Sequence, residues 1–128
     1  VLAANEAALA GAQDSIMLDQ NGMVISSSKG NLFGFMADHF VTPDLERCGI
    51  AGTRRRLLIE KVCPSLSIPV EICTMTLEDL MACSELMICN TVFGIIPVAS
   101  IGNHFWDDAV VSEMLLEKLN HAVRTCDV

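Results

Sequence analysis

Two short apolar runs separated by a polar corner constrain the fold of this chain more than any other feature. The runs are Leu86–Cys89 and Ile95–Val98. They are rich in β-branched residues and interrupted by Asn, Gly and Pro, a pattern that predicts two buried strands. At the corner, the side chains of Asn90 and Thr91 and the turning backbone N–H groups can converge on an anion. An ordinary turn, in which these side chains bond their own backbone, explains the same residues.

Composition limits the class of protein. The chain has 128 residues, of which 52% are hydrophobic, enough for one domain with a sizeable core. Its net charge of −8 argues against nucleic acid or an anionic membrane as a partner, because both require a positive surface. No apolar run approaches the ~18 residues that a membrane helix needs, which predicts a soluble protein.

The spacing and surroundings of the cysteines indicate whether the protein works in a reducing or an oxidising compartment. None of the six forms a CxxC pair, and each lies within an apolar pattern, which favours reduced, buried thiols and a cytoplasmic protein. The cysteines are Cys48, Cys63, Cys73, Cys83, Cys89 and Cys126.

The remaining pattern alternates strands with helices. Asn21-Gly22 is a strong hairpin turn between two alternating runs. Thr76, with Asp79 three residues later, is close to a capping box that begins a short helix. The expected strands are Ser15–Leu18, Met23–Ile25, Asn31–Met36, His39–Val41 and Val70–Thr74, and the expected helices are Val1–Ala10, one that follows the Gly-rich residues 48–52, one from Thr76, and Asp107–Thr125 with Asp107 and Asp108 in its first turn.

A glycine-rich segment leads into the helix that carries the basic residues. The N–H groups at a helix N-terminus attract anions, although every helix has such an end. Arg54, Arg55 and Arg56 are consecutive, so they cannot all face one ligand. We expect at most one of them to face inward. His39, His104 and His121 lack companions at metal-ligand spacing, so no metal site is expected.

The corner and several other motifs resemble one family. The run Glu85–Val98 is similar to a strand–loop–strand of the fold-type IV pyridoxal-phosphate enzymes, and most closely to the aminodeoxychorismate lyases among them. That family also holds D-amino acid and branched-chain aminotransferases. The likeness continues through Leu18-Asp19, Gly22, Val24, Asn31-Leu32-Phe33 and Thr42-Pro43, so it spans nearly the whole chain.

The resemblance implies a fold and a cofactor. The fold class is α/β, in the sense of mixed α+β: residues 1–128 would form the larger, C-terminal domain of the D-amino acid aminotransferase-like fold, a mixed β-sheet or pseudo-barrel with flanking helices. The cofactor is pyridoxal 5'-phosphate. By resemblance, the backbone N–H groups of Ile50 and Ala51 hold its phosphate, Asn90 and Thr91 form the second half of the phosphate cup, and the motif makes Arg54 the inward-facing arginine.

Ser26 departs from the family pattern. At this position the family usually has a Glu, whose carboxylate pairs with the protonated pyridine nitrogen. A hydroxyl can hydrogen-bond that nitrogen but supplies no charge, so the ring would be a weaker electron sink. Transamination should suffer more than pyruvate elimination, which is driven by aromatisation of the product. A polar strand edge is the other explanation of Ser26–Ser28.

The opening residues carry a further expectation. The helical composition of Val1–Ala10 has no N-cap before it, which suggests a chain cut from a longer one. By resemblance, an N-terminal domain and the Schiff-base lysine would precede Val1, since Lys29, Lys61 and Lys118 do not match the lysine motif. The complete protein would be a homodimer, and this chain alone would be inactive.

Three functions follow as hypotheses. The first is release of pyruvate from 4-amino-4-deoxychorismate to give 4-aminobenzoate for folate synthesis. The second is transamination, of the D-amino acid or branched-chain type, which differs in requiring a keto acid. The third is a phosphate-binding or association domain without chemistry of its own.

Overall fold

The computed structural model describes residues 15–45 and 52–126. The expected helix Val1–Ala10 and the candidate residues Ile50 and Ala51 lie outside this part.

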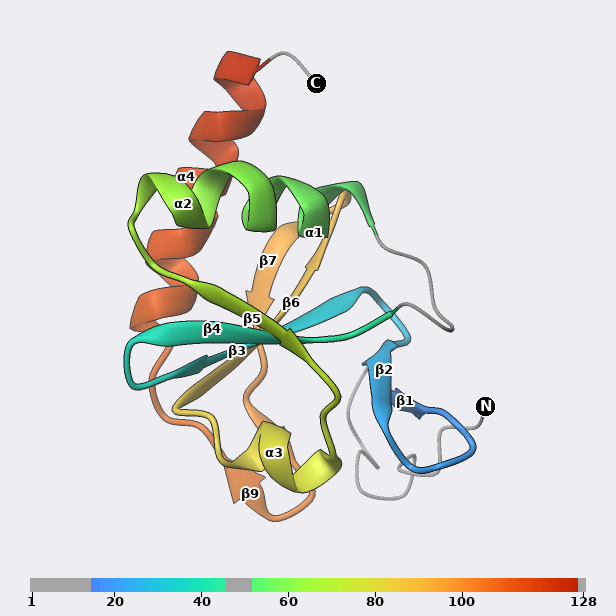
Figure 1. Ribbon diagram of the computed structural model, residues 1–128. Helices are drawn as coiled ribbons and strands as arrows, with labels where there is room; N and C mark the ends of the chain where they lie inside the picture. The colour runs from blue at the N-terminus through green and yellow to red at the C-terminus, as the bar shows by residue number, and fades with distance from the viewer. Residues whose placement is uncertain (1–14, 46–51, 127–128) are drawn as a thin grey trace.

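A five-stranded mixed sheet forms the centre of the molecule (Figure 1). Its strand order is β5-β4-β3-β6-β7, and all neighbours are antiparallel except the parallel pair β4 and β5. Two hairpins, β1–β2 and β8–β9, lie outside it. The strands are β1 Ile16–Leu18, β2 Val24–Ser27, β3 Asn31–Met36, β4 His39–Pro43, β5 Val70–Cys73, β6 Glu85–Asn90, β7 Gly94–Pro97, β8 Ser100–Ile101 and β9 His104–Phe105.

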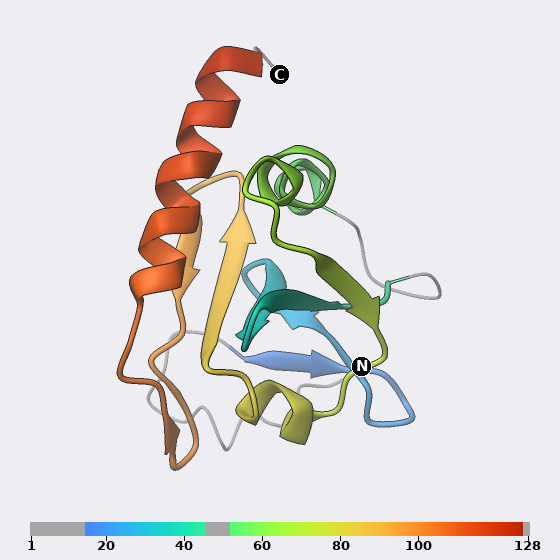
Figure 2. The same cartoon turned by 60° about the vertical axis from the view of Figure 1, so that its left-hand side comes forward.

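Helices flank the sheet, as predicted. Three short elements follow one another without interruption as one helical segment, whose middle turn, η1, is a π-helix. In Figure 2 the long helix α4 runs alongside β6 and β7 and projects past them. The helices are α1 Thr53–Leu57, η1 Leu58–Val62, α2 Cys63–Ser65, α3 Leu77–Met81 and α4 Val110–Cys126.

The central strands are buried on both faces. Along β6, Leu86 and Ile88 point into one apolar cluster with β1, β2 and α3, whereas Met87 and Cys89 point into another with α1, η1 and α4. In β3, Leu32 and Phe33 divide in the same way. A strand that alternates between two cores reads as a continuous apolar run, which is why the sequence pattern identified these strands.

The predicted hairpin and capping box are confirmed. Met17 pairs with Ser26 across the first hairpin, and Gly22 in its turn has a φ of +82° that favours glycine. Thr76 accepts a hydrogen bond from the N–H of Asp79 at 3.1 Å, and the Asp79 carboxylate accepts one from the N–H of Thr76 at 2.9 Å. These bonds fix the start of α3.

The start of the last helix differs from the prediction. Helix α4 begins at Val110, so Asp107 and Asp108 precede its first turn. The N–H groups of Val111 and Ser112 instead donate to the buried carboxylate of Glu85 on β6, each at 3.0 Å. Because that carboxylate already satisfies the helix end, the two aspartates remain exposed outside it.

The predicted fold class is therefore confirmed. No helix within the described residues is long and apolar enough to cross a membrane.

Candidate functional site

The start of α1 and the Asn90 corner meet at the same end of the sheet (Figure 1). Asn31 links them. Its backbone pairs with Cys89, the residue before Asn90, and its side-chain oxygen accepts a hydrogen bond from the N–H of Gly52 at 3.2 Å. Asn31 is buried, so this link is held within the packed body of the domain.

Two glycines allow this close approach. A side chain at Gly52 would place its Cβ 2.7 Å from the Asn31 side-chain oxygen, and one at Gly30 would overlap the Cys89 carbonyl oxygen. Gly52 ends the Gly-rich segment that the sequence singled out, so the described part of that segment lies against the first residue of β3, the strand that pairs with β6.

The Asn90 side chain stabilises its own corner. Its Oδ1 accepts hydrogen bonds from the N–H groups of Val92 at 2.9 Å and Phe93 at 3.0 Å, and its Nδ2 donates to the Lys29 carbonyl at 2.7 Å. The Asn90 side chain therefore bonds within its own turn, as the ordinary-turn interpretation predicted. Thr91 is exposed, and its hydroxyl and N–H are groups of a type that can hydrogen-bond an anion.

The helix presents backbone N–H groups toward the same end. Gly52 is the N-cap of α1 and supplies no side-chain cap. The first N–H of the helix that bonds back to it is that of Arg56, to the Gly52 carbonyl at 3.1 Å, so those of Thr53 and Arg54 precede the helical ladder. The motif pointed to the side chain of Arg54, but the backbone N–H groups of Thr53 and Arg54 were not predicted as donors. The position of the first helical residue after the Gly-rich segment could have identified them.

The arginine expected to face inward was wrong by one position. Arg55, not Arg54, is buried, with 8% of its surface exposed, and its Nη2 donates to the Pro43 carbonyl at 3.0 Å. Arg55 shares the inward stripe of the helix with Leu58 and Val62, three and seven residues later, both of which are buried. Burial lowers the pKa of its guanidinium, while the nearby Cys89 and Asp44 act in the opposite direction.

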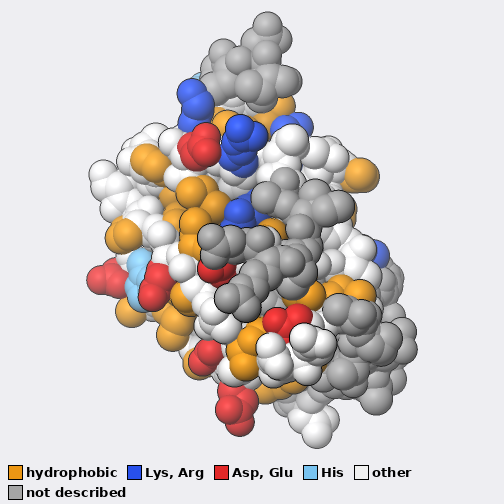
Figure 3. Space-filling model, turned by 45° about the vertical axis from the view of Figure 1, so that its right-hand side comes forward, with side chains coloured by type: hydrophobic (Ala, Val, Ile, Leu, Met, Phe, Trp, Pro, Cys, Tyr) orange, Lys and Arg blue, Asp and Glu red, His pale blue; other side chains and the backbone are white. Residues whose placement is uncertain are grey.

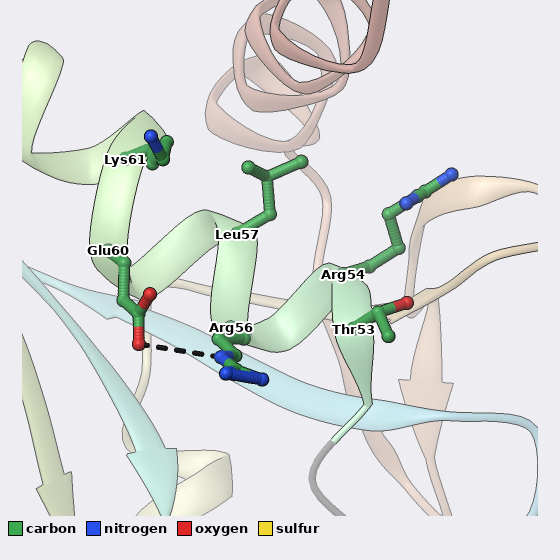
Figure 4. Close-up of a pocket in the computed structure, with 6 residues that line it drawn as sticks. All are labelled: Thr53, Arg54, Arg56, Leu57, Glu60 and Lys61. Atoms are coloured by element: carbon green, nitrogen blue, oxygen red, sulfur yellow. Dashed lines mark ion pairs between the residues drawn. The ribbon is translucent and has the colours of Figure 1, made fainter. Parts of the chain in front are cut away.

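The other two arginines lie outward. Arg54 and Arg56 line a pocket of about 350 Å³ along α1 and η1, where Arg56 pairs with Glu60 at 3.6 Å (Figure 4). Figure 3 shows that several Lys and Arg side chains gather at this end of the molecule, where one acidic side chain lies among them, while most of the acidic side chains lie below. The candidate site is thus at the positive end of an acidic protein.

Ser26 lies on β2, half-buried, opposite Met17 on β1. Its neighbour Ser27 is buried and accepts hydrogen bonds from the N–H groups of Lys29 and Gly30, at 3.0 and 3.1 Å. That turn leads directly to the Lys29 carbonyl that holds Asn90. Ser26 is therefore three residues before Lys29, whose carbonyl contacts the Asn90 corner.

Nucleophilic and metal chemistry have little support at this site. Cys89 is fully buried, and burial raises the pKa of its thiol to about 12, so it is not an available thiolate. Among the described residues, no three His, Cys, Asp or Glu side chains are grouped to hold a metal ion. What the described residues at this end of the sheet do offer is backbone N–H groups at the start of α1, which can bind an anion.

Comparison with known proteins gives the same family. The model of the amino-transferase class IV family matches residues 1–101. An aminodeoxychorismate lyase of Vibrio harveyi is 33% identical over 69% of this chain and 32% of its own length. A probable branched-chain-amino-acid aminotransferase of Thermotoga maritima is 32% identical over 71% of this chain and 33% of its own length. The chain thus spans about a third of the length of these relatives.

Solved structures share the fold. The 4-amino-4-deoxychorismate lyase of Pseudomonas aeruginosa superposes with a TM-score of 0.77 at 30% identity, over 93% of this chain and 43% of that one. A branched-chain aminotransferase of Thermobaculum terrenum, solved in its pyridoxal-phosphate form, gives a TM-score of 0.83 at 22% identity, over 92% of this chain and 39% of that one. Together with the family match over residues 1–101, these likenesses show that the chain belongs to the class IV aminotransferases, the fold-type IV family.

Proposed function

We propose that this chain is the C-terminal, cofactor-binding domain of a pyridoxal-phosphate enzyme that releases pyruvate from 4-amino-4-deoxychorismate, giving 4-aminobenzoate for folate synthesis. One observation carries the cofactor part of the proposal. The N-terminus of α1 and the Asn90 corner, two anion-binding signals far apart in the sequence, are joined through Asn31 at one end of the sheet.

The residues present fit a phosphate ester. The N-terminus of α1 is capped by a glycine without a side-chain acceptor, and a buried arginine follows it. We propose that the phosphate is held by the N–H groups of Thr53 and Arg54, by those of Ile50 and Ala51 before Gly52, and by the N–H and hydroxyl of Thr91, with Asn90 shaping the corner. The Ser26 hydroxyl would hydrogen-bond the pyridine nitrogen.

The roles of this chain's residues are binding and orientation. When bound, the cofactor supplies an electron sink for bonds to the carbon that bears the substrate's amino group. The backbone N–H groups would hold its phosphate, and the Ser26 hydroxyl would hydrogen-bond the pyridine nitrogen without adding charge. A neutral partner on that nitrogen leaves the ring less protonated than a carboxylate does.

The choice of lyase over aminotransferase rests on two supports. The run Glu85–Val98 is similar to that of the lyases, and the lyase of Vibrio harveyi is a relative at 33% identity. Ser26 in place of the usual Glu favours elimination, which needs less from the ring because aromatisation drives it. The aminotransferase of Thermotoga maritima, at 32% identity, keeps transamination as the second candidate.

The rest of the enzyme is also part of the proposal. We propose that an N-terminal domain contributes the Schiff-base lysine and closes the site against water, and that the active protein is a homodimer in the cytoplasm. The 128-residue chain alone would then be catalytically silent.

One experiment separates the candidate functions. The complete gene product is incubated with pyridoxal phosphate and one of three substrates: 4-amino-4-deoxychorismate, a branched-chain amino acid or a D-amino acid. Pyruvate, 4-aminobenzoate and glutamate are measured with and without 2-oxoglutarate. The lyase forms both products without the keto acid. Amino-group transfer that depends on 2-oxoglutarate, without 4-aminobenzoate, would identify an aminotransferase. Absence of any cofactor binding would leave the non-catalytic association domain.

A further inference from the structure

Arg55 is a buried cation at the positive end of a helix. It lies in the first turn of α1, which contains no acidic residue, and it is flanked in sequence by Arg54 and Arg56. The aligned peptide dipoles place partial positive charge at this end, so a cation here is repelled by the helix. In the protein without ligand, the positive charge of Arg55 is therefore in an electrostatically unfavourable position.

The hydrogen bonds of Arg55 are incomplete. Its Nη2 donates to the Pro43 carbonyl at 3.0 Å, but its buried Nε has no acceptor. A buried donor without a partner costs stability, and such groups in native proteins often mark function. Asp44 is the nearby acid that favours the charged guanidinium, yet it is exposed, so solvent screens much of its attraction.

The neighbours of Arg55 place its charge beneath the candidate site. Pro43 ends β4, and Cys89 is the last buried residue before the Asn90 corner on β6. The guanidinium is thus enclosed between the N-terminus of α1 and the ends of two central strands. In this poorly solvated position its attraction for an anion at the helix end is screened less than that of the exposed Arg56.

We propose that Arg55 is a positioning residue for the phosphate ester of the cofactor: its buried charge is unfavourable in the empty site and is compensated when a dianion binds at the N-terminus of α1. This inference rests on the proposed function. It differs from a purely structural role in one respect: a structural arginine stabilises the empty and the loaded protein equally, whereas Arg55 would stabilise the loaded protein more.

The test compares the complete gene product with its variants R55M, R55K and R56M. Met has a similar length without charge, Lys keeps the charge without the planar fork, and Arg56 is an exposed arginine on the same helix. Urea unfolding in phosphate-free buffer measures the empty protein. Calorimetric titrations with inorganic phosphate, pyridoxal phosphate and pyridoxal measure binding.

In phosphate-free buffer R55M should unfold at a lower urea midpoint than the wild type, because the buried Pro43 carbonyl loses its donor. Added phosphate should raise the midpoint of R55M less than that of the wild type, because binding stabilises the folded state in proportion to affinity. The affinity of R55M for inorganic phosphate should fall by about tenfold or more, the scale of one lost charge-assisted interaction. Pyridoxal binding should be unchanged. R55K should fall between R55M and the wild type, and R56M should match the wild type in both measurements.

Two results would overturn the inference. One is an R55M protein that binds inorganic phosphate as tightly as the wild type. The other is an R55M protein whose urea midpoint rises with added phosphate as much as that of the wild type, because the charge would then make no difference to binding. A wild type that binds neither inorganic phosphate nor pyridoxal phosphate would instead reject the proposed function, and this inference with it.

Discussion

Glu85 and Ser112 join the central sheet to the last helix. The Glu85 carboxylate is buried and accepts hydrogen bonds from the N–H and the hydroxyl of Ser112, at 3.0 and 3.2 Å, and from the N–H of Val111 at 3.0 Å. A strand residue therefore performs the role of an N-cap for a helix that begins 25 positions later. The negative charge also complements the positive end of α4.

Replacing Glu85 by Gln should lower the free energy of unfolding by about 1 to 3 kcal/mol, because one carboxylate oxygen that accepts an N–H becomes a donor that faces it. Urea denaturation measures the loss. Glu113→Gln is the control: Glu113 is exposed in the first turn of the same helix, and its replacement should change stability by less than about 0.5 kcal/mol. Equal losses in both variants would show that total charge, not the cap, matters.

Asn31→Ala should loosen the link between α1 and β3. The N–H of Gly52 loses its acceptor, which should cost about 1 to 2 kcal/mol of stability. Because the same bond positions the helix end, affinity for pyridoxal phosphate should fall as well. Asn103→Ala, in the exposed turn between β8 and β9, is the matched control and should change neither quantity. Loss of stability with unaltered cofactor affinity would separate Asn31 from the site.

Ser26→Glu, made in the complete protein, should raise side transamination relative to pyruvate release, since a carboxylate stabilises the protonated pyridine nitrogen. The measurement is the ratio of amino-group transfer to pyruvate formed, with the cofactor bound. Ser28→Glu introduces the same charge two residues away at an exposed position. If the two variants give the same ratio, Ser26 does not face the ring.

The buried thiols should be unreactive in the folded protein. Burial raises the pKa of Cys63 and of Cys83 to about 11, and that of Cys89 to about 12, from an ordinary value of 9.0. Iodoacetamide at pH 8 should therefore label these residues only in urea, as peptide mass spectrometry can show. Because the folded state holds these protons more tightly, their contribution to stability is complete below pH 9 and is lost as the pH rises toward 12. Rapid labelling without urea would contradict this burial.

The 128-residue chain by itself should bind pyridoxal phosphate weakly and reversibly. Its phosphate site offers only a few charge-assisted hydrogen bonds, each worth roughly 1 to 3 kcal/mol. After borohydride reduction, peptide mapping should find no stoichiometric label on Lys29, Lys61 or Lys118. Stoichiometric attachment at one of them, with pyruvate released from the aminated chorismate, would place the reactive lysine within this chain.

Local patterns were sufficient to predict most of the described strands and helices. The runs Leu86–Cys89 and Ile95–Val98 became β6 and β7 with shifts of one residue at their ends. Asn31–Met36 was predicted with the boundaries that β3 has. These elements were predictable because their signals lie within the segment itself, in its apolar periodicity and its turn residues.

Features that depend on distant residues were not predictable in this way. The carboxylate that begins α4 lies on β6, 27 positions from Ser112, so Asp107 and Asp108 seemed the better candidates. The inward arginine depends on the rotation of α1, which only its packing determines; a single residue separates Arg54 from Arg55. The amide group of Asn90 can hydrogen-bond either a bound anion or the backbone of its own turn, so the sequence alone did not distinguish the two. The structure shows its side chain bonded within the turn.

The pairing of β3 with β6 also has a kinetic consequence. These neighbours are the centre of the sheet, yet the hydrogen bond at one end of their ladder, from Ser84 to the Phe35 carbonyl, spans 49 positions of the chain. Closing so long a loop costs conformational entropy before the contacts that it permits are made. The local hairpins and α3 can form early, whereas the core between β3 and β6 must wait for this encounter. The backbone amides of these two strands should then be the slowest to exchange with deuterium, and their docking the step that limits the folding rate.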